Sequence, residues 1–472
     1  MPKARKLTGL PVRPLPAELA RFVRKQMAST RTPGAAVGIL YRGRAYAEGF
    51  GVTNVDNPLP VDHETLFQIG STGKTFTATA ILRLVERGDL DLDVPVRRYV
   101  KELALKDDAV ARRVTLRHLL THTGGWAGDL FLDTGRGDDA LARAVEAMRK
   151  IPQLTPLGST FHYNNAGFYL AGRVIEKVTG TSYEQAITDL CLQPLGMTRS
   201  FHFAEELIPH RVAIGHVAKG AKQLPQPWWR ERNVGPLGAL VSDVVDQLRW
   251  AWFHLGDGRA PDGKRLLKKS TLKDMQRSHA PAGALSEWVG LPWLIDDVDG
   301  IRIVAHGGTT NGQLSTFTMV PSKDLAVTTL TNSTSGRSLN RNVVARVLER
   351  YAGIKRHPPA RAKISTGELR AYQGRYVDGF KEVALDLVPS GGALRVTLTA
   401  LRGDDDETPP QLRLALFAED RAVHIDKTYT GLRAEFLRGP SGRVAWLRMG
   451  GRLYRRVSAQ PNGRPVRRAS SR

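Results

Sequence analysis

The C-terminal part of the chain alternates between apolar and polar residues in short stretches, and this pattern constrains the fold most strongly. The stretches read GRYV, VALDLV, ALRVTLTA, LRLALF, AVHI, LRAEFL, VAWLRM and LYRRV. Turn signals such as PSGG and GPSG separate them. About eight strands within roughly 95 residues predict a small antiparallel barrel or sandwich. A closed barrel is favoured because it leaves no unpaired edge strand.

The residues before this part mix helical and extended patterns. A helical pattern opens at Pro16, and a predicted hairpin follows from residue 35. Apolar helical patterns cover residues 75–87, 139–149, 166–179 and 243–255, and strand patterns return at 301–305, 315–320 and 325–331. This order predicts one sheet gathered from both ends of a mixed α and β (α+β) domain, with helices packed on it.

These patterns predict five segments. We expect a basic flexible arm at residues 1–15, a large domain at 16–354, a linker at 355–365, the small β-barrel at 366–458 and a basic flexible tail at 459–472. The linker prediction rests on the sequence KRHPPARAKIS, which contains proline, is basic and is poor in apolar residues.

Composition excludes several classes of protein. Apolar residues make up 41% of the chain, which is typical of a folded protein rather than a disordered one. The single cysteine, Cys191, excludes an internal disulfide and a cysteine-based metal cluster, so we expect neither a metal site nor another cofactor. We expect no membrane span, because no apolar run approaches ~18 residues. The N-terminus lacks an apolar signal region, which favours a cytoplasmic location.

The net charge of +23 raises the question of nucleic-acid binding. No zinc-finger spacing, heptad zipper or aromatic RNA-binding motif accompanies the charge, and part of it lies in the two terminal segments. We therefore expect no specific nucleic-acid partner. The sequence leaves assembly into a homo-oligomer open.

Ser71 and Lys74 form an S-x-x-K motif in the stretch FQIGSTGKTF, at the start of a predicted helix. Residues three apart lie on one face of a helix, so the amine can approach the hydroxyl and act as its base. The motif alone is weak, because chance supplies it in a long basic protein. The same stretch resembles a phosphate-binding P-loop, but Gln68 stands where that motif requires glycine.

Two further motifs strengthen the signal. Tyr163 and Asn165 stand at Y-x-N spacing before an apolar helix, and His306 and Gly308 stand at H-x-G spacing at the end of a strand. Each alone fits an ordinary core tyrosine, helix cap or glycine turn. Together and in this order, the three motifs resemble the serine β-lactamase and penicillin-binding-protein-like family. The resemblance covers residues 15–350 and is closest to its class C β-lactamase, D-aminopeptidase and carboxylesterase branch.

The resemblance implies a β-lactamase/transpeptidase-like fold, with an antiparallel sheet sandwiched by helices and a helical lobe beside it. The eight-stranded C-terminal part resembles the lipocalin-like barrels attached to some relatives. By the same resemblance, Ser71 would be acylated, and Lys74 and Tyr163 would together act as general base and general acid.

The resemblance also implies the substrate-binding residues. Asn165 would orient the substrate, and the backbone N–H of Thr309 would complete an oxyanion hole with that of Ser71. Gly308 would let the substrate lie close to the strand. The third motif begins with His306 where lactamases usually carry lysine, and a mostly neutral histidine suits a substrate carboxylate less well.

The expected function is therefore that of a serine hydrolase acting on a small-molecule ester, amide or peptide substrate. The alternatives are β-lactamase or D-alanyl carboxypeptidase activity, and a non-catalytic binding relative of the same fold. Two other features allow a competing interpretation. His118 and His122 have the spacing of metal ligands, but packing or local hydrogen bonds are the better interpretation. Trp228 and Trp229 could equally well line a substrate cleft or fill the core.

Overall fold

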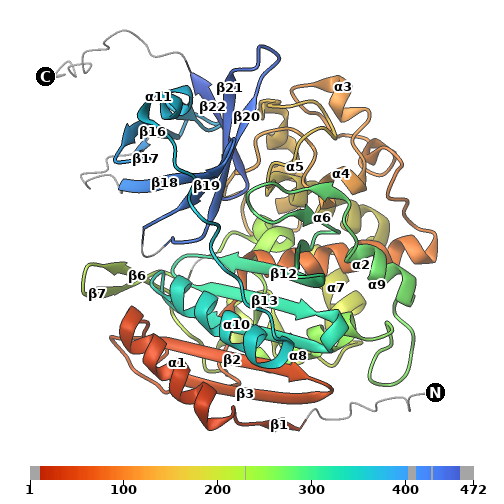
Figure 1. The fold of residues 1–472 in the computed structure, drawn as a ribbon. Coiled ribbons are helices and arrows are strands. Elements are labelled where there is room, and N and C mark those ends of the chain that lie inside the picture. Colours follow the sequence, from red (N-terminus) through yellow and green to blue (C-terminus); the bar gives the residue numbers. More distant parts are fainter. Residues whose placement is uncertain (1–10, 229, 402–410, 427–428, 458–472) are drawn as a thin grey trace, which may run out of the picture. The chain divides into compact units, whose positions relative to one another are not determined.

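The computed structural model describes residues 11–228, 230–401, 411–426 and 429–457. It divides into two compact units (Figure 1). The first comprises Met1–Ala282 and Ser286–His357, and the second comprises Gly283–Leu285 and Pro358–Arg472. Residues 1–10 of the predicted arm, Trp229 and the predicted tail at 459–472 lie outside the described residues.

A mixed sheet forms the centre of the first unit. Its order is β1-β3-β2-β14-β13-β12-β11-β10-β9. The strands are β1 (Val12–Arg13), β2 (Gly34–Tyr41), β3 (Arg44–Gly51), β9 (Ala280–Pro281), β10 (Trp288–Val289), β11 (Leu294–Val298), β12 (Ile301–Thr309), β13 (Leu314–Val320) and β14 (Leu325–Thr331). Because β2 pairs with β14, the two ends of the domain meet in the middle of the sheet, as the sequence predicts.

Helices cover both faces of this sheet. On β2, Val37 and Ile39 face a core cluster shared with α1 (Ala17–Thr30) and α10 (Gly336–Ala352). Gly38 lies between them and points to the opposite face, where a Cβ would stand 3.2 Å from the Leu248 side chain of α8 (Val244–Leu255). This alternation follows the two-residue period of a strand. The two helices on the first face, α1 and α10, lie side by side (Figure 1).

The remaining helices and short strands of this unit hold the loops around the predicted site. The helices are α2 (Lys74–Arg87), α3 (Asp108–Ala111), α4 (Leu116–Leu120), α5 (Ala140–Ala147), α6 (Ala166–Thr179), α7 (Tyr183–Ile187) and α9 (Lys269–Met275). A small sheet joins β4 (Phe67–Gln68), β8 (Val241–Ser242) and β5 (Ser200–Phe201), and β6 (His216–Lys219) pairs with β7 (Lys222–Pro225).

The end of the predicted flexible arm is ordered, which corrects that prediction for its last residues. Val12 and Arg13 pair in parallel with Ala45 and Tyr46 of β3, and Leu15 is buried in the core cluster. The edge of β3 offers backbone groups that need partners, and an apolar residue nearby fixes the chain against it.

The second unit is a closed barrel, which confirms the predicted all-β fold. Its strands are β15 (Gly374–Val377), β16 (Val383–Ser390), β17 (Ala393–Ala400), β18 (Gln411–Ala418), β19 (Arg421–His424), β20 (Arg433–Arg438), β21 (Val444–Met449) and β22 (Arg452–Val457). The short helix α11 (Thr366–Leu369) precedes them and is capped by Ser365. Tyr376, Leu385 and Leu447 lie in the core of the barrel, so apolar side chains fill at least part of its interior.

The boundary near residue 357 leads to a prediction. We expect a chain ending at His357 to fold and to keep Ser71 reactive towards a small acylating probe, because the first unit has its own core. Circular dichroism and mass spectrometry of the labelled protein measure both properties. An insoluble or unreactive truncation would show that the barrel is needed by the first unit.

Within the part of the chain that the structure describes, no helix combines the length and apolar character that crossing a bilayer demands. The cytoplasmic location stays a prediction.

Candidate active site

Ser71 lies in a tight turn, Gly70–Gly73, that runs directly into α2. Lys74 begins the helix, and its Nζ donates a hydrogen bond to Ser71 Oγ at 3.0 Å and another to the Leu237 carbonyl at 2.7 Å. Lys74 is fully buried. The structure therefore brings together the two residues of the predicted S-x-x-K pair. Its two hydrogen bonds fix the position of the Lys74 amine beside the Ser71 hydroxyl.

Two glycines let this turn lie against the end of β12. Gly70 has a φ of +54°, and a Cβ there would stand 2.8 Å from the backbone nitrogen of Thr309. A Cβ on Gly308 would stand 1.9 Å from the Ile69 carbonyl oxygen. Side chains at these positions are thus excluded, and the backbones of the Ser71 turn and of Thr309 come close together. This is the arrangement that an oxyanion hole built from both segments requires.

Tyr163 lies over the amine. Lys74 Nζ is 5.1 Å from the Tyr163 ring centroid and 5.2 Å from that of Phe168 on α6. The His122 ring stacks on Tyr163 with centroids 4.4 Å apart, and the His306 ring lies 6.3 Å from it. The backbone N–H of Asn164 donates to His122 Nδ1 at 2.9 Å, which fixes the histidine. The sequence does not single out His122 for this supporting position.

Asn165 precedes α6 but does not cap it with its side chain. Its Nδ2 donates to Asp129 Oδ1 at 2.6 Å. Its Oδ1 is buried and has no hydrogen-bond partner among the described residues. Asn165 therefore holds an acceptor ready for a substrate N–H or for a moving amine.

His306 lies on β12 and is almost fully buried. Burial, with a smaller contribution from the charge of Lys74, lowers the pKa of His306 to about 3. The ring is therefore neutral at pH 7, as the sequence predicts for most of the population. Its Nδ1 donates to the Gly307 carbonyl at 2.8 Å, so Nε2 carries a lone pair and can only accept. His306 offers no positive charge to a substrate carboxylate.

Sequence reasoning missed Asp129 as well as His122. The glycine-rich loop after residue 122 was the sequence signal that this segment packs closely against the site. A Cβ on Gly128 would stand 2.5 Å from the Tyr163 carbonyl oxygen. His118 instead bonds to Thr115 Oγ1 at 2.8 Å, at the start of α4. The predicted local hydrogen bond is therefore present for His118, whereas His122 accepts from the backbone of Asn164, 42 residues further along the chain.

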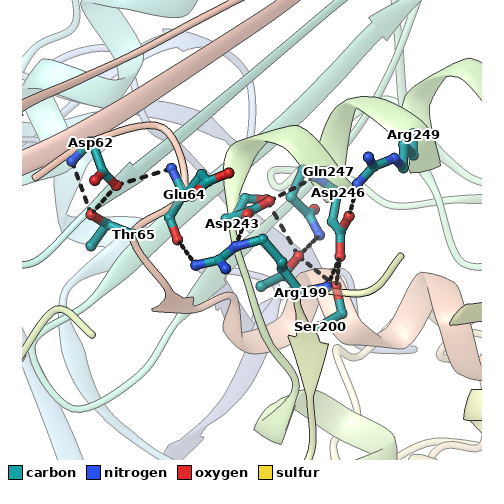
Figure 2. Close-up of polar contacts among 10 residues, drawn as sticks. Asp62, Glu64, Thr65, Arg199, Ser200, Asp243, Asp246, Gln247 and Arg249 are labelled. Carbon is teal, nitrogen blue, oxygen red and sulfur yellow. Dashed lines mark hydrogen bonds and ion pairs between the residues drawn. The ribbon is translucent and has the colours of Figure 1, made fainter. Parts of the chain in front are cut away.

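A buried polar network anchors the strand beside the nucleophile (Figure 2). Arg199 Nε donates to Asp243 at 2.9 Å, and the Arg199 backbone N–H donates to Asp246 at 2.8 Å. Ser200 also donates to Asp246, and Arg249 forms an ion pair with it. The two aspartates lie at the start of α8, directly after β8, and β8 pairs with Phe67 and Gln68 of β4. The network thus supports the segment that leads to Ser71.

The sequence model of the Beta-lactamase family matches residues 19–350. This chain belongs to that family. Penicillin-binding protein 4 of Amycolatopsis lactamdurans is 36% identical over 332 residues, which cover 68% of this chain and 87% of that protein. Unguisins hydrolase ungD' of Aspergillus campestris is 26% identical over 68% of this chain, which spans only 62% of that protein.

Solved structures share the fold. SurE superposes with a TM-score of 0.73 at 25% identity, over 93% of this chain and 98% of SurE. The octameric penicillin-binding protein homologue from Pyrococcus abyssi gives 0.63 at 27% identity, over 93% and 98%. A class C beta-lactamase from Rhodobacter sphaeroides gives 0.60 at 23% identity, over 70% of this chain and 99% of that protein. The chain is a serine hydrolase of the beta-lactamase family.

Proposed function

We propose that this protein hydrolyses small esters, or small amides and peptides, through an acyl-enzyme on Ser71. The observation that carries the proposal is the 3.0 Å hydrogen bond between Nζ of the fully buried Lys74 and Oγ of the half-buried Ser71. A serine hydroxyl becomes a useful nucleophile only when a base beside it can take its proton.

The proposed reaction has two halves. Ser71 Oγ attacks the substrate carbonyl while its proton passes to Lys74, and the oxyanion is held by the backbone N–H groups of Ser71 and Thr309. The carbonyl re-forms, and the alcohol or amine departs with a proton supplied through Tyr163 or Lys74. Water then attacks the acyl-enzyme, gives up a proton to the same pair and releases the acid, which restores Ser71.

The substrate side of the site supports esters and small amides over lactams. Asn165 offers its free Oδ1 to a substrate N–H, and Gly308 leaves room for the substrate beside β12. Neutral His306 provides no cation for the carboxylate that β-lactams carry. The names of the relatives, a penicillin-binding protein and a hydrolase, favour amide or peptide chemistry as the second choice.

A comparison of three substrates tests this proposal. We expect measurable hydrolysis of short-chain nitrophenyl esters, lower turnover of D-amino-acid amides and only trace turnover of a chromogenic cephalosporin. An amide has a poorer leaving group than an ester, and a β-lactam also requires recognition of its carboxylate and fast attack of water on a stable acyl-enzyme. Values of kcat/KM from one preparation, with Ser71→Ala as the blank, decide it. The highest value on the cephalosporin would identify a β-lactamase, and no turnover or probe labelling at all would favour a non-catalytic relative.

Assembly belongs to the same proposal. The Pyrococcus abyssi homologue is octameric, which supports a homo-oligomer here. Light scattering on the purified full chain measures the mass directly.

A further inference from the structure

A cavity of about 470 Å³ lies in the first unit, beside the strand that leads to Ser71. Gln68 of β4 lines it, together with residues 202–206 and parts of the segment 228–241. Among the described residues that line it, none belongs to the proposed acylation site. Its volume falls in the range of about 300–1,000 Å³ that is usual for small-molecule sites.

Most charged groups in the cavity wall are already satisfied. Arg232 forms ion pairs with Glu184 at 3.3 Å and with Asp138 at 2.7 Å. Arg136 lies 3.6 Å from Glu205. Glu206 accepts the backbone N–H groups of residues 202 and 203. These groups form the frame of the cavity and need no ligand.

Arg230 differs from the other two arginines. It forms no ion pair or hydrogen bond with any other described residue, and its Nε is completely buried. Burial lowers the pKa of Arg230, although the guanidinium stays charged at neutral pH because its ordinary pKa is so high. The charge of the neighbouring Glu231 offsets only part of the cost of burying this cation, and an anion that enters the cavity and pairs directly with the guanidinium recovers more of it.

Acceptors line the same cavity. Gln68 Nε2 donates to the Trp228 carbonyl at 3.1 Å, which fixes the amide and leaves its buried Oε1 without a partner among the described residues. The Glu231 carboxylate forms no ion pair within the described part of the chain, and it follows Arg230 directly. A cation, two acceptors and the Trp228 side chain therefore meet around one space.

We propose that this cavity binds a small ligand that carries both a carboxylate and an N–H donor, such as an α-amino acid or the end of a short peptide. The carboxylate pairs with the planar fork of Arg230. The N–H or ammonium group donates to Gln68 Oε1 or to Glu231, and the apolar part lies against Trp228. No bond is made or broken. This binding goes beyond the proposed hydrolysis, since it uses other residues.

Calorimetric titration with N-acetylleucine tests the site. All proteins carry Ser71→Ala, so that turnover plays no part and the result does not depend on the proposed function. We expect Arg230→Gln to weaken binding by about tenfold or more, as loss of a charge-assisted pair should. Arg230→Lys should fall between, and N-acetylleucine amide should bind much more weakly than the acid because it lacks the charge.

Two controls separate this site from others. Arg143→Gln removes a surface arginine that pairs with Asp139 and should leave the affinity unchanged. Asn165→Ala alters the acylation cleft and should also leave it unchanged. Melting temperatures confirm that each variant is folded. The proposal fails if N-acetylleucine does not bind, if its amide binds equally well, or if Asn165→Ala weakens binding while Arg230→Gln does not.

Discussion

Replacing Ser71 with alanine is expected to lower kcat/KM for a nitrophenyl ester by about 10⁴- to 10⁶-fold, because the variant has no nucleophile to acylate. Lys74→Ala should cost nearly as much. Its Nζ is the base hydrogen-bonded to Ser71 Oγ, and no other described cation bonds to that oxygen. Steady-state rates and labelling by a fluorophosphonate probe measure the two losses independently.

The double variant gives the sharper result. Ser71 and Lys74 act as one unit, so the pair of changes should be little worse than either alone. Ser159→Ala is the matched control: this serine is exposed and bonds only locally, so its loss should leave kcat/KM unchanged. Losses that multiply in the double variant, or robust turnover by purified Ser71→Ala protein, would contradict the assignment of the nucleophile.

Local periodicity was enough to predict the parts of the site that lie within one element. Ser71 and Lys74 stand three residues apart at a helix start, so their contact follows from helix geometry alone. The strands of the barrel likewise follow from a two-residue alternation. Tyr163 and His306 lie far along the chain, and only the resemblance to a known family placed them beside Lys74.

Contacts set by tertiary packing escaped the sequence. Asn165 and Asp129 are 36 residues apart and meet because a glycine-rich loop folds over the start of α6. Val12 joins the sheet although its neighbours are basic and proline-rich, since the exposed edge of β3 outweighs local composition. Neither case leaves a periodic signal, because the partner rather than the segment decides the structure.

The pairing of Arg199 with the buried Asp243 is another such contact, and its removal should strongly destabilise the fold. Arg199→Met is expected to lower the free energy of unfolding by about 2–3 kcal/mol at pH 10, because it leaves the ionised and buried Asp243 carboxylate without its cation, whereas Asp246 keeps Arg249. Asp243 and Asp246 are fully buried, so water does not replace the lost partner. Urea unfolding measures the change.

The pH dependence of this stability loss shows whether the charge of Arg199 causes it. Burial, reinforced by the neighbouring Asp246, raises the pKa of Asp243 to about 8, well above the ordinary value near 4. Between those values the folded state holds a proton that the unfolded state has lost, so this group makes stability fall as pH rises. Without Arg199 the raised pKa rises further. The deficit of the variant should therefore be small at pH 5, where the carboxyl is protonated with or without Arg199, and should grow above pH 8, where the carboxyl ionises in the wild type but not in the variant.

Arg211→Met supplies the matched control. Arg211 pairs with Asp62 at the surface, where both side chains are more than a third exposed, and its loss should cost no more than about 1 kcal/mol at either pH. A deficit in Arg199→Met that is equal at pH 5 and pH 10 would assign the loss to packing of the arginine stem rather than to its charge. A deficit no larger than that of Arg211→Met would show that the network does not support β8, and with it the strand that leads to Ser71.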